Sequence, residues 1–320
     1  MPRMPLRTRA FTYLLDHLIY PNVADLDLDG IRRSRAQVAP NRPPFSWVTG
    51  PVPAHIRISD EWFPTRDGSR RQLRVYRPTG TGPHPVVIYY HGGGWVLNST
   101  RLYDPLCAMI AARTSALVLS VDYRMAPEHR APQAVHDAVD ALRWAGESVG
   151  ELHGDPSRIA VCGDSAGGNL AALVCHVAHD DGGPRIRHQA LLYPGTDLSR
   201  SFPSILEHAN APVLTKRMVD VFVAHYLGPE PHLDPRDPTI SPYWREDLRG
   251  LPPALVVTAD IDPVRDEGLA YARRLAEAGV PTRSTNYLGA THGFFGYPGA
   301  TLVGRQALLE LVTELWRHLR

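Results

Sequence analysis

The amino-acid sequence predicts an α/β fold, with a mostly parallel central sheet that carries helices on both faces. From about residue 85 onward, short apolar stretches alternate with longer segments whose apolar residues recur at helical spacing. Two earlier apolar stretches follow one another without a helix between them, as in a hairpin, so we expect a mixed sheet. At 320 residues, 43% of them hydrophobic, the chain is long enough to enclose a large core.

Each element follows from a local pattern. Apolar residues at helical spacing predict an amphipathic helix over residues 8–20, with an apolar face made of Phe11, Leu14, Leu15, Leu18 and Ile19. Residues 40–53 are rich in proline and predict a linker. Strands are expected at 55–63, 71–78, 85–91, 116–124, 158–165, 188–194, 253–262 and 282–289. Helices are expected at 132–148, 166–179, 266–279 and 301–319.

One long segment interrupts this alternation. Residues 199–248 contain no strand-like stretch, although apolar spacing predicts a helix near 215–228. Insertions of this length between core elements are usually functional lids. Because ligands of such sheets bind at the carboxyl ends of the strands, the residues just after each strand are the candidates for a site.

The composition excludes several classes of protein. The formal net charge of +1 gives no reason to expect nucleic acid or an anionic membrane as a partner. Lys216 is the only lysine and no glycine precedes it, so the lysine-containing phosphate loop of nucleotide-binding enzymes is absent. The three cysteines lack disulfide or metal-ligand spacing, which favours buried thiols in a reducing compartment; they are Cys107, Cys162 and Cys175.

The start of the chain has basic residues followed by apolar ones, which superficially suggests a signal peptide. Asp16 and His17 interrupt the apolar run, and no small-residue cleavage site follows. No stretch reaches about 18 uninterrupted apolar residues. We therefore expect a cytoplasmic protein without stable membrane insertion, and we expect neither a metal site nor a cofactor.

A candidate nucleophile lies in the stretch Gly163-Asp164-Ser165-Ala166-Gly167-Gly168, between an expected strand and an expected helix. The pattern Gly-x-Ser-x-Gly in that context is typical of a nucleophile elbow, a sharp turn that projects the serine hydroxyl above the sheet. Gly163 and Gly167 must lack side chains for the neighbours of Ser165 to fit. Asp164 and Gly167 are expected to support the turn.

A serine hydroxyl needs a base that takes its proton, and in the order serine, acid, histidine that base comes late in the chain. Only His292 and His318 follow the last expected strands. His318 falls in the closing helix, where we expect a solvated surface residue. His292 falls in a loop directly after a strand, so His292 is the candidate base.

The third residue must orient the imidazole and stabilise its protonated form. Four acidic residues follow the strand at 253–262, namely Asp260, Asp262, Asp266 and Glu267. Asp266 and Glu267 fall in the first helical turn, where acids suit the helix dipole. Asp262 precedes a proline and suits a helix N-cap as well. Position favours Asp262, and Asp260 stays open as an alternative.

Three consecutive glycines follow the strand at 85–91, in the stretch His91-Gly92-Gly93-Gly94-Trp95. Such a loop suits either a phosphate or a developing oxyanion, but the single lysine and the lack of a ribose-binding acid disfavour phosphate. An attack by Ser165 on an ester creates an oxyanion, for which Ala166 supplies one backbone N–H and the glycine loop the others. His91 is expected to anchor the loop, Gly92 to give it slack, and Trp95 stays open between core packing and a pocket wall.

These motifs together resemble the hormone-sensitive-lipase-like family of α/β-hydrolases, which includes many bacterial carboxylesterases. The resemblance spans about residues 60–320. It rests on HGGGW at 91–95, DYRMAPEH at 122–129, GDSAGGN at 163–169, DPVRDEG at 262–268 and HGF at 292–294.

The resemblance implies the α/β-hydrolase fold and a role for each matching residue. Ser165 is expected as nucleophile, Asp262 as acid and His292 as base, with oxyanion donors at Gly93, Gly94 and Ala166. Within DYRMAPEH, Arg124 and Glu128 are expected to be buried and paired, shaping the loop. The implied domains are N-terminal cap helices and a linker at 1–50 and a catalytic domain at 51–320, with a cap insertion at about 199–248.

The implied activity is that of a cofactor-independent serine carboxylesterase, which hydrolyses short- to medium-chain esters through an acyl-enzyme. The expected partner is a small-molecule ester, and the sequence is also compatible with a homodimer. Two alternatives keep the fold, namely a natural-product tailoring deacetylase or acyltransferase with the same triad and a non-hydrolytic lyase. A third is a non-catalytic ligand-binding receptor, which would be expected to have lost a residue of the triad; all three are present.

Overall fold

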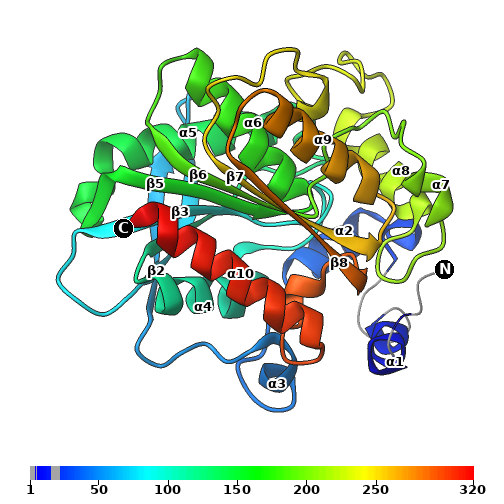
Figure 1. Ribbon diagram of the computed structural model, residues 1–320, viewed down its shortest axis with the longest axis horizontal. Coiled ribbons are helices and arrows are strands. Elements are labelled where there is room, and N and C mark those ends of the chain that lie inside the picture. Colours follow the sequence, from blue (N-terminus) through cyan, green and yellow to red (C-terminus); the bar gives the residue numbers. More distant parts are fainter. Residues whose placement is uncertain (1–3, 5, 16–21) are drawn as a thin grey trace.

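In the computed structural model of Figure 1, the described residues, 4, 6–15 and 22–320, form an eight-stranded sheet in the order β1-β2-β4-β3-β5-β6-β7-β8. The strands β1 and β2 pair antiparallel, as do β2 and β4, and the remaining neighbours are parallel. This confirms the mixed, mostly parallel sheet. The strands are Arg57–Pro64 (β1), Arg70–Arg77 (β2), His84–Tyr90 (β3), Leu117–Val121 (β4), Gly154–Asp164 (β5), Ile186–Leu192 (β6), Ala254–Ile261 (β7) and Thr282–Thr291 (β8).

Helices cover both faces of the sheet, as the α/β-hydrolase fold predicts. Helices α5, α6 and α9 pack on one face, and α4 and α10 pack on the other (Figure 1). The helices are Leu6–Leu14 (α1), Leu28–Arg35 (α2), Phe45–Thr49 (α3), Asp104–Thr114 (α4), Gln133–Ser148 (α5), Ala166–Asp180 (α6), Ser204–Glu207 (α7), Lys216–Leu227 (α8), Arg265–Glu277 (α9) and Leu302–Leu319 (α10).

The core is divided by the sheet because successive side chains of a strand point to opposite faces. On β3, Ile88 and Tyr90 face the cluster that contains α5 and α6, whereas Val87 and Tyr89 face the cluster that contains α4 and α10. All four are completely buried. A strand buried on both faces shows no polar alternation, which is why the sequence displays an unbroken apolar run here.

Helices α2, α3, α4 and α7 were not among the helices that the sequence predicted individually. Helix α4 was not predicted, because seven consecutive residues of it, from Pro105 to Ala111, are buried and leave no polar face to reveal a helical period. The short helix α3 lies inside the proline-rich residues 40–53 that were expected to be a linker only. The predicted helix at 8–20 is present as α1, and Leu18 and Ile19 lie outside the described residues.

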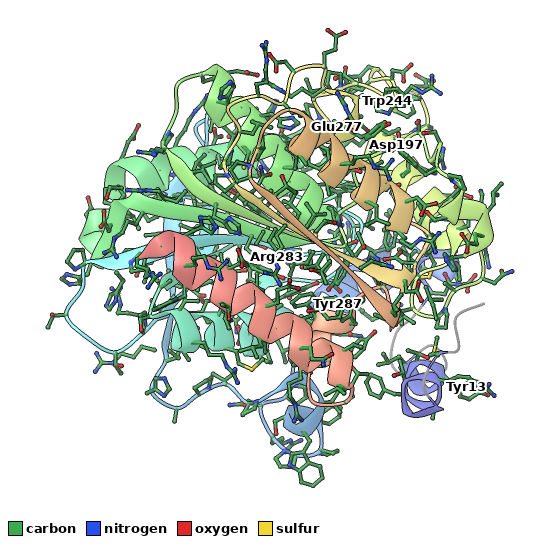
Figure 2. The ribbon with its side chains drawn as sticks, viewed as in Figure 1. Tyr13, Asp197, Trp244, Glu277, Arg283 and Tyr287 are labelled. Atoms are coloured by element: carbon green, nitrogen blue, oxygen red, sulfur yellow. The ribbon has the colours of Figure 1, made fainter. Side chains whose placement is uncertain are left out.

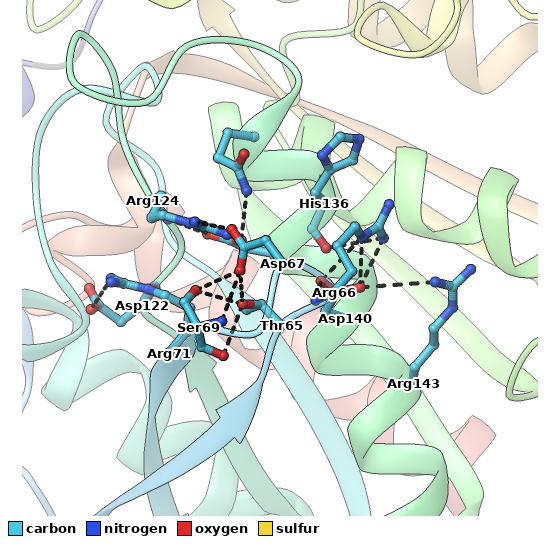
Figure 3. A network of polar contacts seen from close by, with 12 residues as sticks. Thr65, Arg66, Asp67, Ser69, Arg71, Asp122, Arg124, His136, Asp140 and Arg143 are labelled. Carbon is cyan, nitrogen blue, oxygen red and sulfur yellow. Dashed lines mark hydrogen bonds and ion pairs between the residues drawn. The ribbon is translucent and has the colours of Figure 1, made fainter.

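Arg124 connects the loop after β4 to helix α5 and to the β1–β2 turn. Its side chain is 12% exposed, and its guanidinium pairs with Asp137 on α5 at 2.6 Å. It also pairs at 2.6 Å with Asp67 in the β1–β2 turn (Figure 3). Glu128 is exposed instead of buried, because its partner is Arg35 on the surface helix α2, at 3.0 Å. The two residues of the DYRMAPEH stretch therefore anchor different segments.

The segment at 199–248 contains α7 and α8 and no strand among its residues, all of which are described. Helix α8 follows Thr215, whose hydroxyl caps the helix by accepting the N–H of Met218 at 3.2 Å. No helix of the described residues is long and apolar enough to cross a membrane.

Candidate active site

The candidate nucleophile Ser165 occupies a strained turn between β5 and α6. Its backbone angles, φ 55° and ψ −119°, lie in a region that residues with a side chain rarely adopt. A Cβ at Gly163 would lie 2.2 Å from the carbonyl oxygen of Gly167, and a Cβ at Gly167 only 1.9 Å from that of Tyr90. The two glycines are thus required by close backbone contacts, as the elbow pattern predicts.

Three residues that follow three different strands meet at this turn. Ser165 follows β5, Asp262 follows β7 and His292 follows β8. The Ser165 hydroxyl donates to Nε2 of His292 at 2.8 Å, and Nδ1 of His292 donates to Oδ2 of Asp262 at 2.7 Å. This assignment of the ring protons follows from the carboxylate, which can only accept. The arrangement can transfer a proton from the serine to the imidazole and stabilise the resulting positive charge.

The two aspartates that the sequence left as alternatives have different partners. Asp262 is completely buried, and its second oxygen, Oδ1, accepts the backbone N–H of Val264 at 3.0 Å. Asp260 does not contact the imidazole through a hydrogen bond; its Oδ2 accepts the N–H of Gly289 at 3.0 Å. Asp260 therefore holds β7 to β8, and Asp262 holds the histidine.

The three residues expected to supply oxyanion donors lie at the same cavity as the serine. Gly93, Gly94 and Ala166 all line it, and none of these amides donates a hydrogen bond to a described residue. Gly93 and Gly94 have φ values of 115° and 61°. A Cβ on Gly93 would lie 2.3 Å from the Leu97 oxygen, so glycine is required for the turn. Unpaired backbone donors at a cavity suit an oxygen that becomes negative during a reaction.

The first glycine of the loop, Gly92, was expected only to make the turn flexible, but it also makes a close contact with Asp164. A Cβ at Gly92 would lie 2.4 Å from Oδ2 of Asp164, so the missing side chain lets this carboxylate approach. Its N–H donates to Oδ1 of Asp164 at 2.9 Å, and its oxygen accepts from Nδ1 of His91 at 2.8 Å. The N–H of Gly92 is therefore fixed by Asp164, and its carbonyl oxygen is fixed by His91.

His91 is buried under the loop and is neutral. Its ring stacks on Tyr123 with centroids 4.5 Å apart, and the Tyr123 hydroxyl donates to the His91 carbonyl at 2.7 Å. Burial lowers the pKa of His91 to about 4, because a charged imidazolium would lose its hydration there. The contacts are those of a residue that anchors the loop.

The cavity above Ser165 has a volume of about 220 Å³ and a mainly apolar lining. The sequence left two roles open for Trp95, core packing and lining of the pocket, and Trp95 has both. Its side chain is 5% exposed and lines the cavity, and its ring stacks on Tyr226 of α8 with centroids 4.4 Å apart. Phe222 of the same helix lies so close to Gly94 that a Cβ there would be 2.2 Å from the ring. Helix α8 therefore forms the wall next to the glycine loop.

Glu267 also lines the cavity, a role that the sequence did not reveal. It is 3% exposed, and its Oε1 accepts the N–H groups of Thr196 and Asp197 at 2.6 and 3.2 Å. Burial raises the pKa of this carboxyl well above its ordinary value. The sequence suggested only an acid in the first turn of a helix, and its partners, 71 and 70 residues away in the chain, gave no local signal.

Comparisons with known proteins identify the family and its fold. A family described by the α/β-hydrolase fold matches residues 87–296. The carboxylesterase NlhH of Mycobacterium tuberculosis is 46% identical over 230 residues, which cover 70% of this chain and 71% of that protein. The carboxylic ester hydrolase LipN of the same organism is 43% identical over 274 residues, covering 83% and 71%.

Solved structures with the same fold cover nearly the whole chain. A hyperthermophilic esterase from the archaeon Pyrobaculum calidifontis has a TM-score of 0.88 at 37% identity, with 99% of both chains covered. A thermostable esterase from Pseudomonas putida has a TM-score of 0.89 at 31% identity, covering 100% of this chain and 99% of that one.

Proposed function

From the premise that the chain belongs to the hormone-sensitive-lipase-like family of α/β-hydrolases, we propose that Ser165, His292 and Asp262 are its catalytic triad. The chain is a serine carboxylesterase, an enzyme that hydrolyses carboxylic esters. The observation that carries the assignment is the pair of hydrogen bonds, 2.8 and 2.7 Å long, that joins the three side chains beside an apolar cavity lined by Ser165 and His292.

In the first half of the reaction, the Ser165 oxygen attacks the ester carbonyl and His292 takes its proton at Nε2. Asp262 keeps Nδ1 protonated and stabilises the imidazolium. The carbonyl oxygen becomes negative and accepts hydrogen bonds from the amides of Gly93, Gly94 and Ala166. One such donor typically contributes about 2.7–4 kcal/mol to stabilising the transition state. The intermediate collapses, His292 returns the proton to the leaving alcohol, and an acyl-enzyme remains.

In the second half, water replaces the alcohol. His292 removes a proton from this water, which attacks the acyl carbonyl while the same three amides stabilise the oxyanion. The carboxylic acid leaves when the Ser165 oxygen regains its proton from His292. Every proton that the serine gives up is thus returned in one cycle, so the enzyme needs no cofactor.

The cavity supports a preference for short- to medium-chain acyl groups. Its volume of about 220 Å³ is limited on one side by α8, whose Phe222 and Tyr226 pack against Gly94 and Trp95. The apolar lining favours a hydrocarbon chain over a charged one.

The two segments expected to form a cap both contribute residues to the lining of this cavity. Ala39 and Thr49 come from residues 1–50, and Leu214, Met218 and Phe222 come from the insertion at 199–248. Arg217 on α8 and Asp25 near the N-terminus form an ion pair at 2.9 Å. These contacts support one cap built from two segments, with 51–320 as the catalytic domain that carries the insertion.

A reducing, cytoplasmic location is supported by the cysteines, which are buried, unpaired thiols. We expect a small-molecule ester as the partner. The homodimer stays a prediction, which light scattering coupled to size-exclusion chromatography checks.

The decisive experiment combines a fluorophosphonate probe with p-nitrophenyl esters from acetate to laurate. The wild-type protein is expected to become labelled at Ser165 and to hydrolyse the shorter esters fastest, whereas Ser165→Ala does neither. A wild-type protein that remains unlabelled and hydrolyses none of the esters would refute the triad. The same esters with an added alcohol distinguish hydrolysis from acyl transfer, because transfer yields a new ester as well as the acid.

A further inference from the structure

His188 is a buried histidine whose ring lacks a hydrogen-bonding partner. It lies on β6, is 1% exposed, and neither ring nitrogen makes a hydrogen bond to a described residue. The carbonyl of Pro253 lies beside the ring and accepts the backbone N–H of Gln189 at 2.9 Å; its second lone pair can serve at most one of the two ring nitrogens. Buried polar atoms without a partner are rare, and an ion or a water molecule is the usual reason for one.

Two more side chains with metal-ligand chemistry lie against this ring. His318 on α10 stacks on His188 with ring centroids 4.3 Å apart, and it is part-buried instead of the solvated surface residue that the sequence predicted. Glu314 lies one helical turn before His318, with its Oε2 3.7 Å from Nε2 of His318. One ligand atom from each of the three side chains lies within 4.8 Å of the other two.

The carboxylate of Glu314 is oriented by arginines at its other oxygen. Oε1 pairs with Arg317 at 2.8 Å and with Arg283 of β8 at 3.7 Å, and both arginine side chains are 55% exposed (Arg283 is labelled in Figure 2). These partners are solvated and lie on the Oε1 side. Oε2 is therefore the oxygen that faces the two imidazoles.

We propose that His188, Glu314 and His318 bind a divalent transition-metal ion that fastens the last helix to the sheet. Two imidazoles and one carboxylate suit Zn²⁺, with water as the fourth ligand, because Zn²⁺ prefers nitrogen and carboxylate ligands in a tetrahedron. Mg²⁺ and Ca²⁺ prefer sites made of oxygen ligands and do not fit this set.

Binding of the ion would draw the three ligand atoms closer together. Ligand atoms of a tetrahedral Zn²⁺ site lie about 3.4 Å apart, because the bonds to nitrogen and oxygen are about 2.0–2.2 Å long. The lone pair of an imidazole lies in the ring plane, so two stacked rings do not point at one ion. His318, near the end of α10 and 28% exposed, is the residue that turns out of the stack onto the ion.

The site is far from the catalytic cavity. His188 pairs with Ala160, whereas Leu192 pairs with Asp164, the residue before the nucleophile. The four residue steps from His188 to Leu192 span about 13 Å of strand. The ion is therefore expected to stabilise the fold without taking part in ester hydrolysis.

The test uses the full chain, stripped with a chelator and titrated with Zn²⁺ by calorimetry, with the metal content measured after dialysis. We expect one tightly bound Zn²⁺ per chain, a Tm that rises on binding, and no rise with Mg²⁺. Co²⁺ is expected to give visible ligand-field bands typical of a four-coordinate site. His318→Ala and Glu314→Gln are each expected to weaken binding at least about tenfold and to abolish the rise in Tm.

Three controls separate this site from others. His55→Ala removes an exposed histidine in the loop before β1 and is expected to bind Zn²⁺ like the wild type. Each variant is compared with itself, with and without metal, so that a lower starting Tm does not affect the result. If His318→Ala binds Zn²⁺ as tightly as the wild type, or if His292→Asn no longer binds it, then Zn²⁺ binds elsewhere. Either result would overturn the proposal.

Discussion

The carboxylate of Asp164 accepts the backbone N–H of Gly92 at 2.9 Å and thereby joins the nucleophile turn to the oxyanion loop. The hydroxyls of Tyr89 and Tyr103 donate to the same carboxylate at 2.8 and 2.9 Å. Burial raises the pKa of Asp164, and the three hydrogen bonds act against this shift because they stabilise the charged form. The position of the proposed oxyanion donors thus depends on a buried carboxylate outside the proposed triad.

We predict that Asp164→Ala lowers kcat by about 10- to 100-fold while KM changes little. The reason is that Gly93 and Gly94 lose their support, a smaller effect than losing a donor, which costs about 100- to 1000-fold. Asp164→Asn is the matched control, since its amide oxygen still accepts the N–H of Gly92, and it is expected to stay within about fivefold of wild type. Both constants are measured with p-nitrophenyl butyrate. An Asp164→Ala enzyme with the wild-type kcat would contradict the positioning role.

The second prediction separates the two aspartates after β7. Asp262→Asn is expected to lower kcat by about 10⁴-fold, because an amide favours the wrong tautomer of His292 and does not stabilise its charge. Asp260→Asn keeps an oxygen for the N–H of Gly289 and is expected to stay within about tenfold of wild type. Steady-state rates of the two purified variants decide the matter. If Asp260→Asn is the inactive one, the acid has been assigned to the wrong residue.

The candidate site residues were predictable from the sequence because each directly follows a strand. The loop anchor His91 and the proposed triad residues Ser165, Asp262 and His292 come immediately after β3, β5, β7 and β8. The carboxyl ends of parallel strands meet at one edge of a sheet, so a pattern read locally also gives the position in space. Glycines in these loops mark close backbone contacts, and Gly163, Gly167 and Gly93 all have such contacts.

The features that the sequence did not reveal depend on contacts between distant segments. Glu267 lies in the first turn of α9, where an acid is ordinary, and only the fold brings Thr196 to its carboxylate. His318 has the spacing of an exposed helix position, and only the sheet brings His188 against it. Helix α4 lacks an apolar period because it is buried all round. The sequence around Glu267, His318 and α4 therefore contains no pattern that predicts these features.

The third prediction concerns the acyl chain. Phe222→Ala removes the ring that packs on Gly94 and enlarges the cavity next to the oxyanion loop, so the optimum is expected to shift to longer p-nitrophenyl esters. The loss of a buried phenylalanine is also expected to destabilise the fold by about 3–5 kcal/mol. Val221→Ala, on the same helix but not lining the cavity, is the control for the effect on stability. The ratio of kcat/KM for octanoate over butyrate is measured. An unchanged ratio in Phe222→Ala would mean that the acyl chain lies elsewhere.

The fourth prediction follows from the buried carboxyl of Glu267. Its pKa is raised in the folded state and is near 4.5 when unfolded, so above that pH the folded chain binds a proton that the unfolded chain has lost. The free energy of unfolding therefore falls as the pH rises from about 4.5 toward the folded pKa, by up to about 1.4 kcal/mol per pH unit. The test is Glu267→Gln, which keeps the shape of the side chain and an oxygen for the N–H of Thr196 but cannot ionise.

Between pH 5 and 8, the free energy of unfolding of this variant is expected to fall by at least about 1 kcal/mol less than that of the wild type, as measured by denaturant unfolding. Glu277→Gln, an exposed change on the same helix (labelled in Figure 2), is expected to follow the wild-type pH dependence. Parallel curves for Glu267→Gln and the wild type would show that Glu267 is ionised in the folded protein.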